Sequence, residues 1–360
     1  MPSTVHVDGN RTWGGGQVQS LGLALALVAR GEDTRFLAHT GSAIVSRLAE
    51  TYLPWEELPL RGFGGVRSIP HLARRLREWQ PDILHLHDAA SHEAAALAAR
   101  LADSVPVVAT RRTVFPLRSG LLGRAKYGLS DRIICVSEAV RRQCLAAGLS
   151  EAKLVVIPDF VDCRHFDPGA VTLDTTDDRP TVLTMGRLAP EKGHRVLLRA
   201  MAEVAKRVPE VRLLICGEGE ERARLEAQRA ALGLTGTVEF AGFVSDPRAL
   251  LARAHVFVMP SLSEGLGVAV LEAMAMARPV VATDAGGLPE SVVDGETGRV
   301  VPKGNPEALA EAMLSMLDDT RAAQAMGAAG RERAKALFDR PRIVDRIVHL
   351  YEDVLARGTP

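Results

Sequence analysis

The sequence lacks several features that would place it in a familiar class at once. Its four cysteines, Cys135, Cys144, Cys163 and Cys216, form no CxxC pair, so they indicate no disulfide framework. The 44 basic and 44 acidic side chains cancel, which excludes the global basic field of a nucleic-acid-binding protein. No run of 18 uncharged apolar residues is present, and the first residues contain no apolar signal core. We therefore expect a cytoplasmic protein that does not span a membrane.

Length and composition indicate a folded chain with more than one core. The 360 residues are 47% hydrophobic and 24% charged, which is typical of globular proteins. A chain of this length suits two domains of roughly 150 to 200 residues each.

Short apolar runs alternate with helical patterns along the chain, and this alternation predicts an α/β fold with parallel sheets. A stretch rich in Asp, Thr, Pro and Gly interrupts the pattern at residues 162–180. We predict an N-terminal Rossmann-like domain over 1–165, a linker over 166–180 and a second Rossmann-like domain over 181–340. A last amphipathic helix over 341–360 either stays with the second domain or crosses back to the first. Two such domains facing each other across a cleft would place ligands at the carboxyl ends of their strands. The expected strands cover 5–7, 34–38, 82–87, 105–110, 132–137 and 153–158, then 181–186, 211–217, 237–242, 255–260, 278–283 and 298–302.

One side chain does not suit its surroundings in the segment SEGLGVAVLEAMAMARPVV, residues 263–281. Glu272 falls within a run of Val, Leu, Ala and Met that predicts a buried helix from about Gly267 to Ala277. A buried carboxylate needs hydrogen-bond donors, and the two adjacent hydroxyls of a ribose would supply them. The alternative is a neighbouring Arg or backbone group of the protein itself. The preceding turn with Gly265 and Gly267 would let a phosphate approach the helix N-terminus, with Glu264 beside it.

Two cations follow the first strand of the second half. Arg187 and Lys192 lie in GRLAPEKG, where the strand should end at the ligand-binding edge. An Arg fork and a mobile Lys ammonium beside a helix N-terminus would neutralise a diphosphate without a metal. A second segment, CGEGEE, offers only Gly217 and Gly219, with Arg222 in place of a third glycine, so we reject a dinucleotide fingerprint and hydride transfer.

These segments together resemble a known family. GRLAPEKG, CGEGEE, VEFAGFV, PSLSEGLGVAVLEAMAMARPVVATDAGGLPE and DGETGRVVP occur in an order similar to that of retaining glycosyltransferases of family 4, which have the GT-B fold. The resemblance implies that Glu264 contacts the donor sugar and Glu272 the ribose, while Arg187 and Lys192 hold the diphosphate. It also implies donor contacts from residues that border the base or the phosphates: Phe243, Val244, Gly265, Leu266 and Gly267.

The first half carries a weaker signal. Gly14, Gly15 and Gly16 precede a helix, and the loop is similar to the glycine-rich loop of the family, so Gly15 and Gly16 are expected at the donor; the alternative is a tight turn. In DILHLHDAA, His85 and His87 point to the same side of a strand. The resemblance implies that His87 lies near the transferred sugar and acts in catalysis. A two-histidine metal site lacks an obvious third ligand, so we predict no metal.

Basic residues gather just after this strand. Arg111 and Arg112 in ATRRTVFP are candidates to recognise an anionic group on the acceptor, although a salt bridge at the rim of the site explains them equally well. Between residues 111 and 142, eight Arg and Lys face two Asp and Glu. Such a stretch suits peripheral contact with an acidic membrane face or, equally, a set of solvated helix faces.

The combined hypothesis is a metal-independent, retaining glycosyltransferase of the hexosyltransferase type. Its donor would be a UDP- or GDP-sugar, acting as substrate, and no cofactor is expected. The acceptor would be a glycan, a lipid-linked molecule or a small molecule, with cell-envelope glycan or lipopolysaccharide synthesis favoured. Two alternatives stay open: a nucleotide-sugar epimerase, which needs no acceptor, and a non-catalytic nucleotide-sugar-binding protein. Arg187, Lys192, Glu264 and Glu272 together count against the last.

Overall fold

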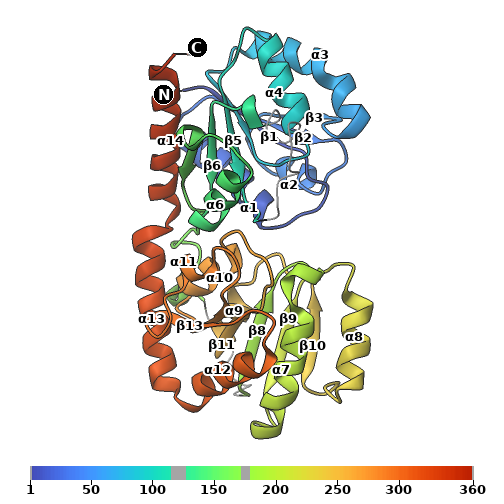
Figure 1. Ribbon diagram of the computed structural model, residues 1–360, viewed down its shortest axis with the longest axis vertical. Helices are drawn as coiled ribbons and strands as arrows, with labels where there is room; N and C mark the ends of the chain where they lie inside the picture. The colour runs from blue at the N-terminus through green and yellow to red at the C-terminus, as the bar shows by residue number, and fades with distance from the viewer. Residues whose placement is uncertain (1, 115–126, 172–178, 359–360) are drawn as a thin grey trace. The chain divides into compact units, whose positions relative to one another are not determined.

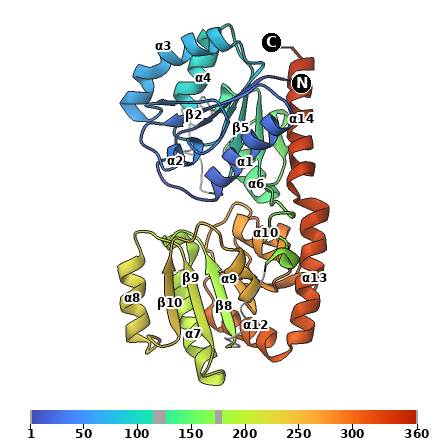
Figure 2. The same ribbon diagram turned by 180° about the vertical axis from the view of Figure 1, so that it is seen from behind.

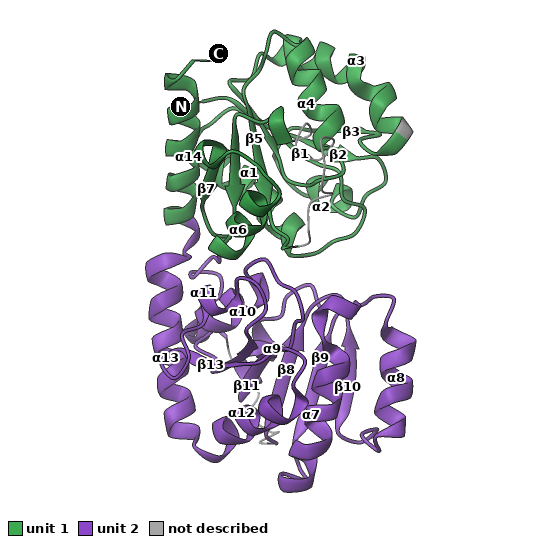
Figure 3. Cartoon of the chain, in the orientation of Figure 1, with its two compact units in different colours: residues 1–159, 341–360 green, residues 160–340 purple. Residues whose placement is uncertain are grey.

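The computed structural model describes residues 2–114, 127–171 and 179–358 and divides into two compact units (Figure 3). Unit 1 contains residues 1–159 and 341–360, and unit 2 contains residues 160–340. The last helix of the chain therefore belongs to the unit in which the chain begins. Residues 172–178 of the expected linker, and residues 115–126 of the basic stretch, lie outside the described residues.

Unit 1 is built on a seven-stranded parallel sheet in the order β3-β2-β1-β4-β5-β6-β7, with helices on its faces (Figures 1 and 2). Its strands consist mainly of apolar residues buried on both sides, as a parallel sheet covered by helices requires. Six of the seven lie where the sequence predicts them. The strands are β1 Thr4–Asp8, β2 Thr34–His39, β3 Trp55–Leu58, β4 Ile83–Leu86, β5 Val107–Arg111, β6 Arg132–Cys135 and β7 Leu154–Val156.

The strand that the sequence analysis missed is β3. It has only four residues, two of them glutamates, and it pairs on one side only, with β2. An edge strand of this kind has no continuous apolar run, so the pattern used for the other strands does not detect it.

The helices of unit 1 follow its strands as crossovers. α6 begins at a Ser137 cap, whose hydroxyl accepts a hydrogen bond from the Val140 amide at 3.2 Å. The predicted C-terminal helix is confirmed, and its apolar residues Ile343, Ile347, Leu350 and Val354 are buried. The helices are α1 Gly15–Ala29, α2 Val45–Leu48, α3 Gly62–Trp79, α4 His92–Leu101, α6 Glu138–Ala146, the 3-10 turn η1 Glu151–Lys153, and α14 Arg340–Ala356.

Unit 2 contains a six-stranded parallel sheet in the order β10-β9-β8-β11-β12-β13. All six strands lie where the sequence predicts them, which confirms the predicted α/β class with two parallel sheets. The strands are β8 Thr181–Met185, β9 Arg212–Cys216, β10 Val238–Gly242, β11 Val256–Met259, β12 Val280–Thr283 and β13 Gly298–Val301.

Helices cover this second sheet as they do the first (Figure 1). Asn305 and Asp319 cap α12 and α13 by accepting hydrogen bonds from the Ala308 and Ala322 amides, each at 2.9 Å. The elements are η2 Pro168–Ala170, η3 Pro190–Lys192, α7 His194–Arg207, α8 Arg222–Ala231, α9 Arg248–Arg253, α10 Val268–Ala275, α11 Leu288–Ser291, α12 Pro306–Asp318 and α13 Thr320–Leu337. Among all the described helices, none is both long and apolar enough to cross a membrane.

Both strand orders reverse once, and each reversal defines a ligand-binding edge. In unit 1 the order turns between β1 and β4, and in unit 2 between β8 and β11. In open parallel sheets, ligands bind beyond the carboxyl ends of the strands at such a switch point. The polar residues that follow β1, β4, β8 and β11 are therefore the first place to look for a site.

Candidate functional site

The loops at the switch point of unit 2 pack backbone against backbone. Gly193 has φ +69°, and a Cβ there would lie 1.9 Å from the carbonyl oxygen of Pro260 at the end of β11. Gly217 has φ +140°, and its Cβ would lie 1.9 Å from the Gly186 carbonyl oxygen. Only glycine fits these positions, so the glycine of CGEGEE that follows β9 serves loop packing. This agrees with the rejection of a dinucleotide fingerprint there.

The close packing brings together Lys192, after β8, and Glu264, after β11. Lys192 Nζ donates a hydrogen bond to Glu264 Oε2 at 2.5 Å, and the hydroxyl of Ser261 donates to the same oxygen at 3.3 Å. The two charged side chains are 22% and 14% exposed, so both still reach solvent. The sequence analysis placed both residues at one site but did not predict their ion pair.

Arg187 lies in the same loop as Lys192 and is half exposed. Its guanidinium pairs with Glu191 and lies 3.6 Å from a carboxylate oxygen of Glu220. Because exposed ion pairs are weak, the cost of exchanging these partners for a diphosphate is small.

The predicted glycine turn and helix follow directly after Glu264. Gly265, Leu266 and Gly267 are buried, and α10 begins at Val268 with Gly267 as its N-cap at φ +93°. The helix ends at Ala275, so it is shorter at both ends than predicted. Its N-terminus has no side-chain cap, which leaves amide donors directed at the switch point.

Glu272 is the fifth residue of α10, and its side chain is half-buried. Its carboxylate has no hydrogen bond or ion pair with any residue that the structure describes. The alternative, in which a neighbouring Arg or backbone group of the protein binds this carboxylate, is therefore not observed. Burial raises the pKa of Glu272 to about 8. The carboxylate is therefore held in apolar surroundings with its hydrogen-bonding capacity available to a ligand.

Phe243 and Val244 follow β10 at the same edge of the sheet. The Phe243 ring is 54% exposed, which is unusual for a large aromatic side chain, and Val244 is half-buried. An exposed aromatic ring beside a phosphate-binding edge provides a surface on which a nucleobase can stack.

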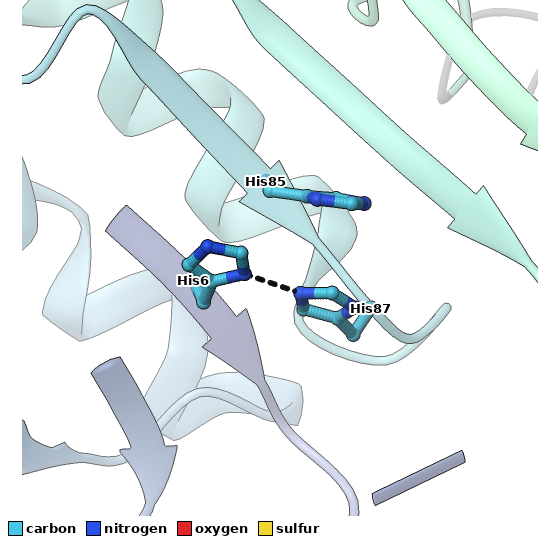
Figure 4. Close-up of side chains that lie close together, drawn as sticks. All are labelled: His6, His85 and His87. Atoms are coloured by element: carbon cyan, nitrogen blue, oxygen red, sulfur yellow. Dashed lines mark hydrogen bonds between the residues drawn. The ribbon is translucent and has the colours of Figure 1, made fainter. Parts of the chain in front are cut away.

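In unit 1, the switch point contains three buried histidines (Figure 4). His6 comes from β1, His85 from β4, and His87 directly follows β4. His6 Nδ1 and His87 Nε2 share a hydrogen bond of 2.8 Å, whereas His85 bonds Tyr351 Oη and Thr110 Oγ1, each at 2.6 Å. Burial lowers the pKa of His6 to about 3 and that of His85 and His87 well below the usual value, so all three rings are neutral.

Three neighbouring histidines can form a metal centre, and His6 is the third histidine, which the sequence analysis did not find. One nitrogen from each ring lies within 4.8 Å of the others. Both nitrogens of His85 are nevertheless bonded to hydroxyls, and its ring stacks on that of His87 with centroids 4.1 Å apart. Stacked rings do not direct their lone pairs at a common point, so the arrangement fits a hydrogen-bonded network better than a metal site.

Two carboxylates also lie at this edge, and the sequence analysis named neither. Asp8 ends β1 and accepts hydrogen bonds from the Gln17 amide at 3.2 Å and the Ser20 hydroxyl at 2.8 Å. Asp88 accepts from the Gly9 amide at 2.6 Å and thereby ties the two strand ends together. Burial, with the charge of Asp88, raises the pKa of Asp8.

The expected glycine loop is in part the first turn of a helix. Gly15 and Gly16 are the first two residues of α1, and Gly14 is its N-cap. The predicted donor contact of Gly15 and Gly16 stays a prediction; the structure places both at a helix N-terminus near the carboxyl end of β1.

The two arginines proposed for the acceptor are held by unit 1 itself. Arg112 donates from Nε to Asp159 at 2.9 Å and from Nη1 to the His87 carbonyl at 3.3 Å. Arg111 is buried and donates to the Tyr127 hydroxyl at 3.1 Å. Arg141 likewise pairs with Glu138 and Glu151. Within the described part of the basic stretch, Arg112 and Arg141 are thus paired with carboxylates of the protein. Arg118, Arg124 and Lys126 lie outside the described residues.

Comparison with known proteins agrees with this architecture. Residues 13–165 match the family model described as Glycosyltransferase Family 4, and residues 172–333 match Glycosyl transferases group 1. A phosphatidyl-myo-inositol mannosyltransferase of Mycobacterium leprae is 32% identical over 363 residues, which cover 96% of this chain and 95% of the relative. The lipopolysaccharide core biosynthesis glycosyltransferase LpsE of Rhizobium meliloti is 34% identical over 222 residues, covering 61% of this chain and 64% of the relative.

Solved structures show the same fold at lower identity. A glycosyltransferase from Rickettsia africae has a TM-score of 0.87 at 22% identity and covers 98% of both chains. Anabaena HepE, solved in complex with UDP and glucose, has a TM-score of 0.87 at 21% identity and covers 98% of this chain and 100% of that one. The fold, together with these family matches, defines a glycosyltransferase with the GT-B fold. The chain belongs to glycosyltransferase family 4.

Proposed function

We propose that this enzyme transfers a sugar from a nucleotide diphosphate sugar to an acceptor hydroxyl, with retention of the anomeric configuration and without a metal. The observation that supports this most is Glu272, a carboxylate without a described partner inside an apolar helix. The paired hydroxyls of a ribose are donors of the right number and spacing for it. The amides at the start of α10, with Arg187 and Lys192, then provide positive potential for two phosphates.

The proposed chemistry depends on stabilising the leaving group. Arg187, Lys192 and the N-terminus of α10 would stabilise the charge that develops on the diphosphate as the glycosidic bond breaks. Glu264 would accept from a sugar hydroxyl, and its ion pair with Lys192 at 2.5 Å would hold both groups in position. No carboxylate is assigned as a covalent nucleophile, so we favour attack of the acceptor on the same face from which the diphosphate leaves. His87 would contact the transferred sugar.

The relatives support a range of donors and acceptors. One is named a GDP-mannose-dependent phosphatidylinositol monomannoside mannosyltransferase, and HepE was solved with UDP and glucose. We propose a UDP- or GDP-hexose as donor and a lipid-linked or lipopolysaccharide-type acceptor of the cell envelope. Peripheral contact with the cytoplasmic membrane face would follow from such an acceptor, and binding to vesicles with and without anionic lipid would test it.

The experiment that tests the donor is a thermal-shift series with UDP, GDP, ADP and their hexose derivatives. A nucleotide that binds the folded state stabilises it by RT ln(1 + [L]/Kd), where [L] is the concentration of free nucleotide, and so raises the melting temperature. We expect one of the diphosphates to stabilise the protein, equally with and without EDTA. Stabilisation that requires a divalent ion would contradict the metal-independent mechanism, and no response to any of the series would contradict the proposed function.

A further inference from the structure

The three buried histidines of unit 1 differ in what their nitrogens contact, and this difference assigns them different roles. Both nitrogens of His85 are bonded to hydroxyls, and those of His6 contact Thr4 Oγ1 at 3.2 Å and His87 Nε2 at 2.8 Å. His87 Nδ1 is buried and has no hydrogen-bond partner among the described residues. Within this cluster, His87 is the member that keeps a ring nitrogen available for another molecule.

The partner of His87 belongs to a continuous chain of hydrogen bonds. Thr34 Oγ1 lies 3.1 Å from Thr4 Oγ1, which contacts His6 Nε2, and His6 Nδ1 contacts His87 Nε2. Figure 4 shows the His6 and His87 rings joined by this bond, with His85 directed elsewhere. In a neutral imidazole, the proton on one nitrogen fixes the other as an acceptor. The nitrogen of His6 that carries the proton therefore determines which nitrogen of His87 carries its proton.

We propose that His6 is a positioning residue that fixes the tautomer of His87, so that His87 carries its proton on Nε2 and presents Nδ1 as a hydrogen-bond acceptor. In this arrangement His87 Nε2 donates to His6 Nδ1, and His6 Nε2 donates to Thr4 Oγ1. A hydroxyl of the transferred sugar is the group that Nδ1 would accept from. This step rests on the proposed function, because His87 is placed at the sugar there.

Two further observations favour this direction of the chain. Arg112 donates to the His87 carbonyl at 3.3 Å, and its positive charge contributes to the lowered pKa of His87. An N–H on the buried Nδ1 would also lack an acceptor among the described residues, and a buried N–H without a partner is costlier than an unpartnered lone pair. The ring stays neutral because it is buried, so its tautomer is the property left for the protein to control.

The test begins with the ligand-free protein and selective ¹⁵N labelling of histidine. Ring nitrogen shifts report directly which nitrogen carries the proton, and His87→Asn identifies the His87 signals. We expect a single Nε2–H tautomer for His87 in the wild type. In His6→Phe the bond is lost, and His87 should show a mixture of tautomers. A wild-type Nδ1–H tautomer, or an unchanged His87 spectrum in His6→Phe, would overturn the proposal.

A second variant keeps the test independent of whether His6→Phe folds. Thr4→Val preserves shape but removes the acceptor of His6 Nε2–H, because valine lacks the hydroxyl. Without this acceptor, each direction of the His6–His87 hydrogen bond leaves one buried N–H unpartnered, either at His6 Nε2 or at His87 Nδ1, so the preference for one direction is lost. His87 should then show a mixture of the Nε2–H and Nδ1–H tautomers. Retention of a single Nε2–H tautomer in Thr4→Val would contradict the chain.

Kinetics separate positioning from packing. His6→Phe should lower kcat for transfer about 10- to 100-fold with a nearly unchanged donor KM. His6→Asn, whose side-chain amide occupies the place of Nδ1, should recover most of that loss. The matched control is His85→Gln, from the same buried cluster but without a hydrogen bond to His87; it should lower the melting temperature and leave the His87 tautomer unchanged. An equal change of the His87 tautomer in His85→Gln and His6→Phe would reduce His6 to a packing role.

The two proposals fail independently. The tautomer is measured without a donor, so it does not depend on nucleotide binding. If no nucleotide binds and the tautomer is as expected, the proposed function is wrong while the hydrogen-bonded chain stands. If nucleotide binds at Glu272 and the tautomer does not respond to His6 or Thr4, the present inference is wrong and the proposed function remains.

Discussion

The switch points of the two units treat their polar side chains in opposite ways. In unit 1, His85, Asp8 and Arg112 are all bonded within the unit, and a single ring nitrogen, His87 Nδ1, stands open in the histidine cluster. In unit 2, Arg187 is half exposed and Glu272 has no described partner. Lys192 and Glu264 pair with each other but still reach solvent. In unit 1, internal hydrogen bonds fix the positions of the polar side chains, which suits precise contact with a sugar. In unit 2, a carboxylate is left without a described protein partner, which suits a ligand that supplies its own hydrogen-bond donors.

The largest expected effect comes from removing the cations of unit 2. Arg187→Ala combined with Lys192→Ala should lower kcat for transfer by at least about 10³-fold, because both charges would stabilise the leaving diphosphate. Arg187 is half exposed, so the fold should remain intact, as circular dichroism would show. The control is Arg207→Ala with Lys206→Ala, a more exposed pair of basic side chains on α7. Near-normal turnover in the site variant would remove the diphosphate role.

The next effect concerns Glu272. Glu272→Ala should weaken binding of the nucleoside diphosphate about 10- to 100-fold, since a hydrogen bond to a charged group is lost in apolar surroundings. Titration calorimetry with UDP or GDP measures this directly. The variant should also be at least as stable as the wild type without ligand, because it removes a half-buried carboxylate that has no described partner. Unchanged nucleotide affinity would contradict the ribose role.

A pH dependence follows from the same residue. The pKa of Glu272 is raised from 4.5 to about 8 in the folded, ligand-free protein, so the folded state holds a proton that the unfolded state has lost between these values. On this account its contribution to the free energy of unfolding is present below pH 4.5 and is lost as pH rises towards 8. Nucleotide needs the ionised carboxylate, so its affinity should rise by up to about tenfold per pH unit below 8.

Calorimetry at several pH values, in buffers with different ionisation enthalpies, checks this. Binding at pH 7 should release close to one proton in the wild type. Glu272→Gln should bind more weakly with a flatter profile. A wild-type affinity that does not change between pH 6 and pH 8 would mean that the carboxylate is already ionised or is not used.

The smallest expected effect tests whether the hydrogen-bonded network of unit 1 stabilises that unit without acting on the nucleotide site of unit 2. Tyr351→Phe removes a buried hydroxyl that lies 2.6 Å from His85 Nδ1. It should cost about 1 to 3 kcal/mol of stability, because the buried imidazole nitrogen loses its partner. Urea denaturation measures the cost, and nucleotide affinity should not change. A lowered nucleotide affinity would show that the unit 1 network also acts on the donor site.

More of the candidate site residues could be named from the sequence in unit 2 than in unit 1, because the signals in unit 2 lie within single segments of the chain. Glu272 is out of place in its own helix, and Lys192 and Glu264 each follow an evident strand end, so a single pass along the chain finds them. His6 looks like an ordinary residue of a short apolar strand. Its importance depends on β1 and β4 being neighbours with His6 opposite His85, and only the sheet order reveals that. The sequence analysis did not name Asp8 and Asp88 for the same reason.

The ends of helices and strands were harder to predict from the sequence than their presence. The α10 helix is shorter than its apolar run because Gly267 adopts φ +93°, and because Ala277, also at positive φ, lies beyond its last turn. The short edge strand β3 has too few apolar residues to be recognised. The partners of Arg111 and Arg112 could not be foreseen either, since Tyr127 and Asp159 are distant in sequence.

The return of the last helix to unit 1 has a consequence for biosynthesis. Residues 1–159 emerge from the ribosome well before Tyr351 and the apolar face of α14, and all of unit 2 is made in between. Until then, the surface that α14 will cover, including His85, stays uncovered, and closing it requires contacts between distant parts of the chain. The second unit can therefore fold before α14 has been made, whereas the first is completed only once α14 is available.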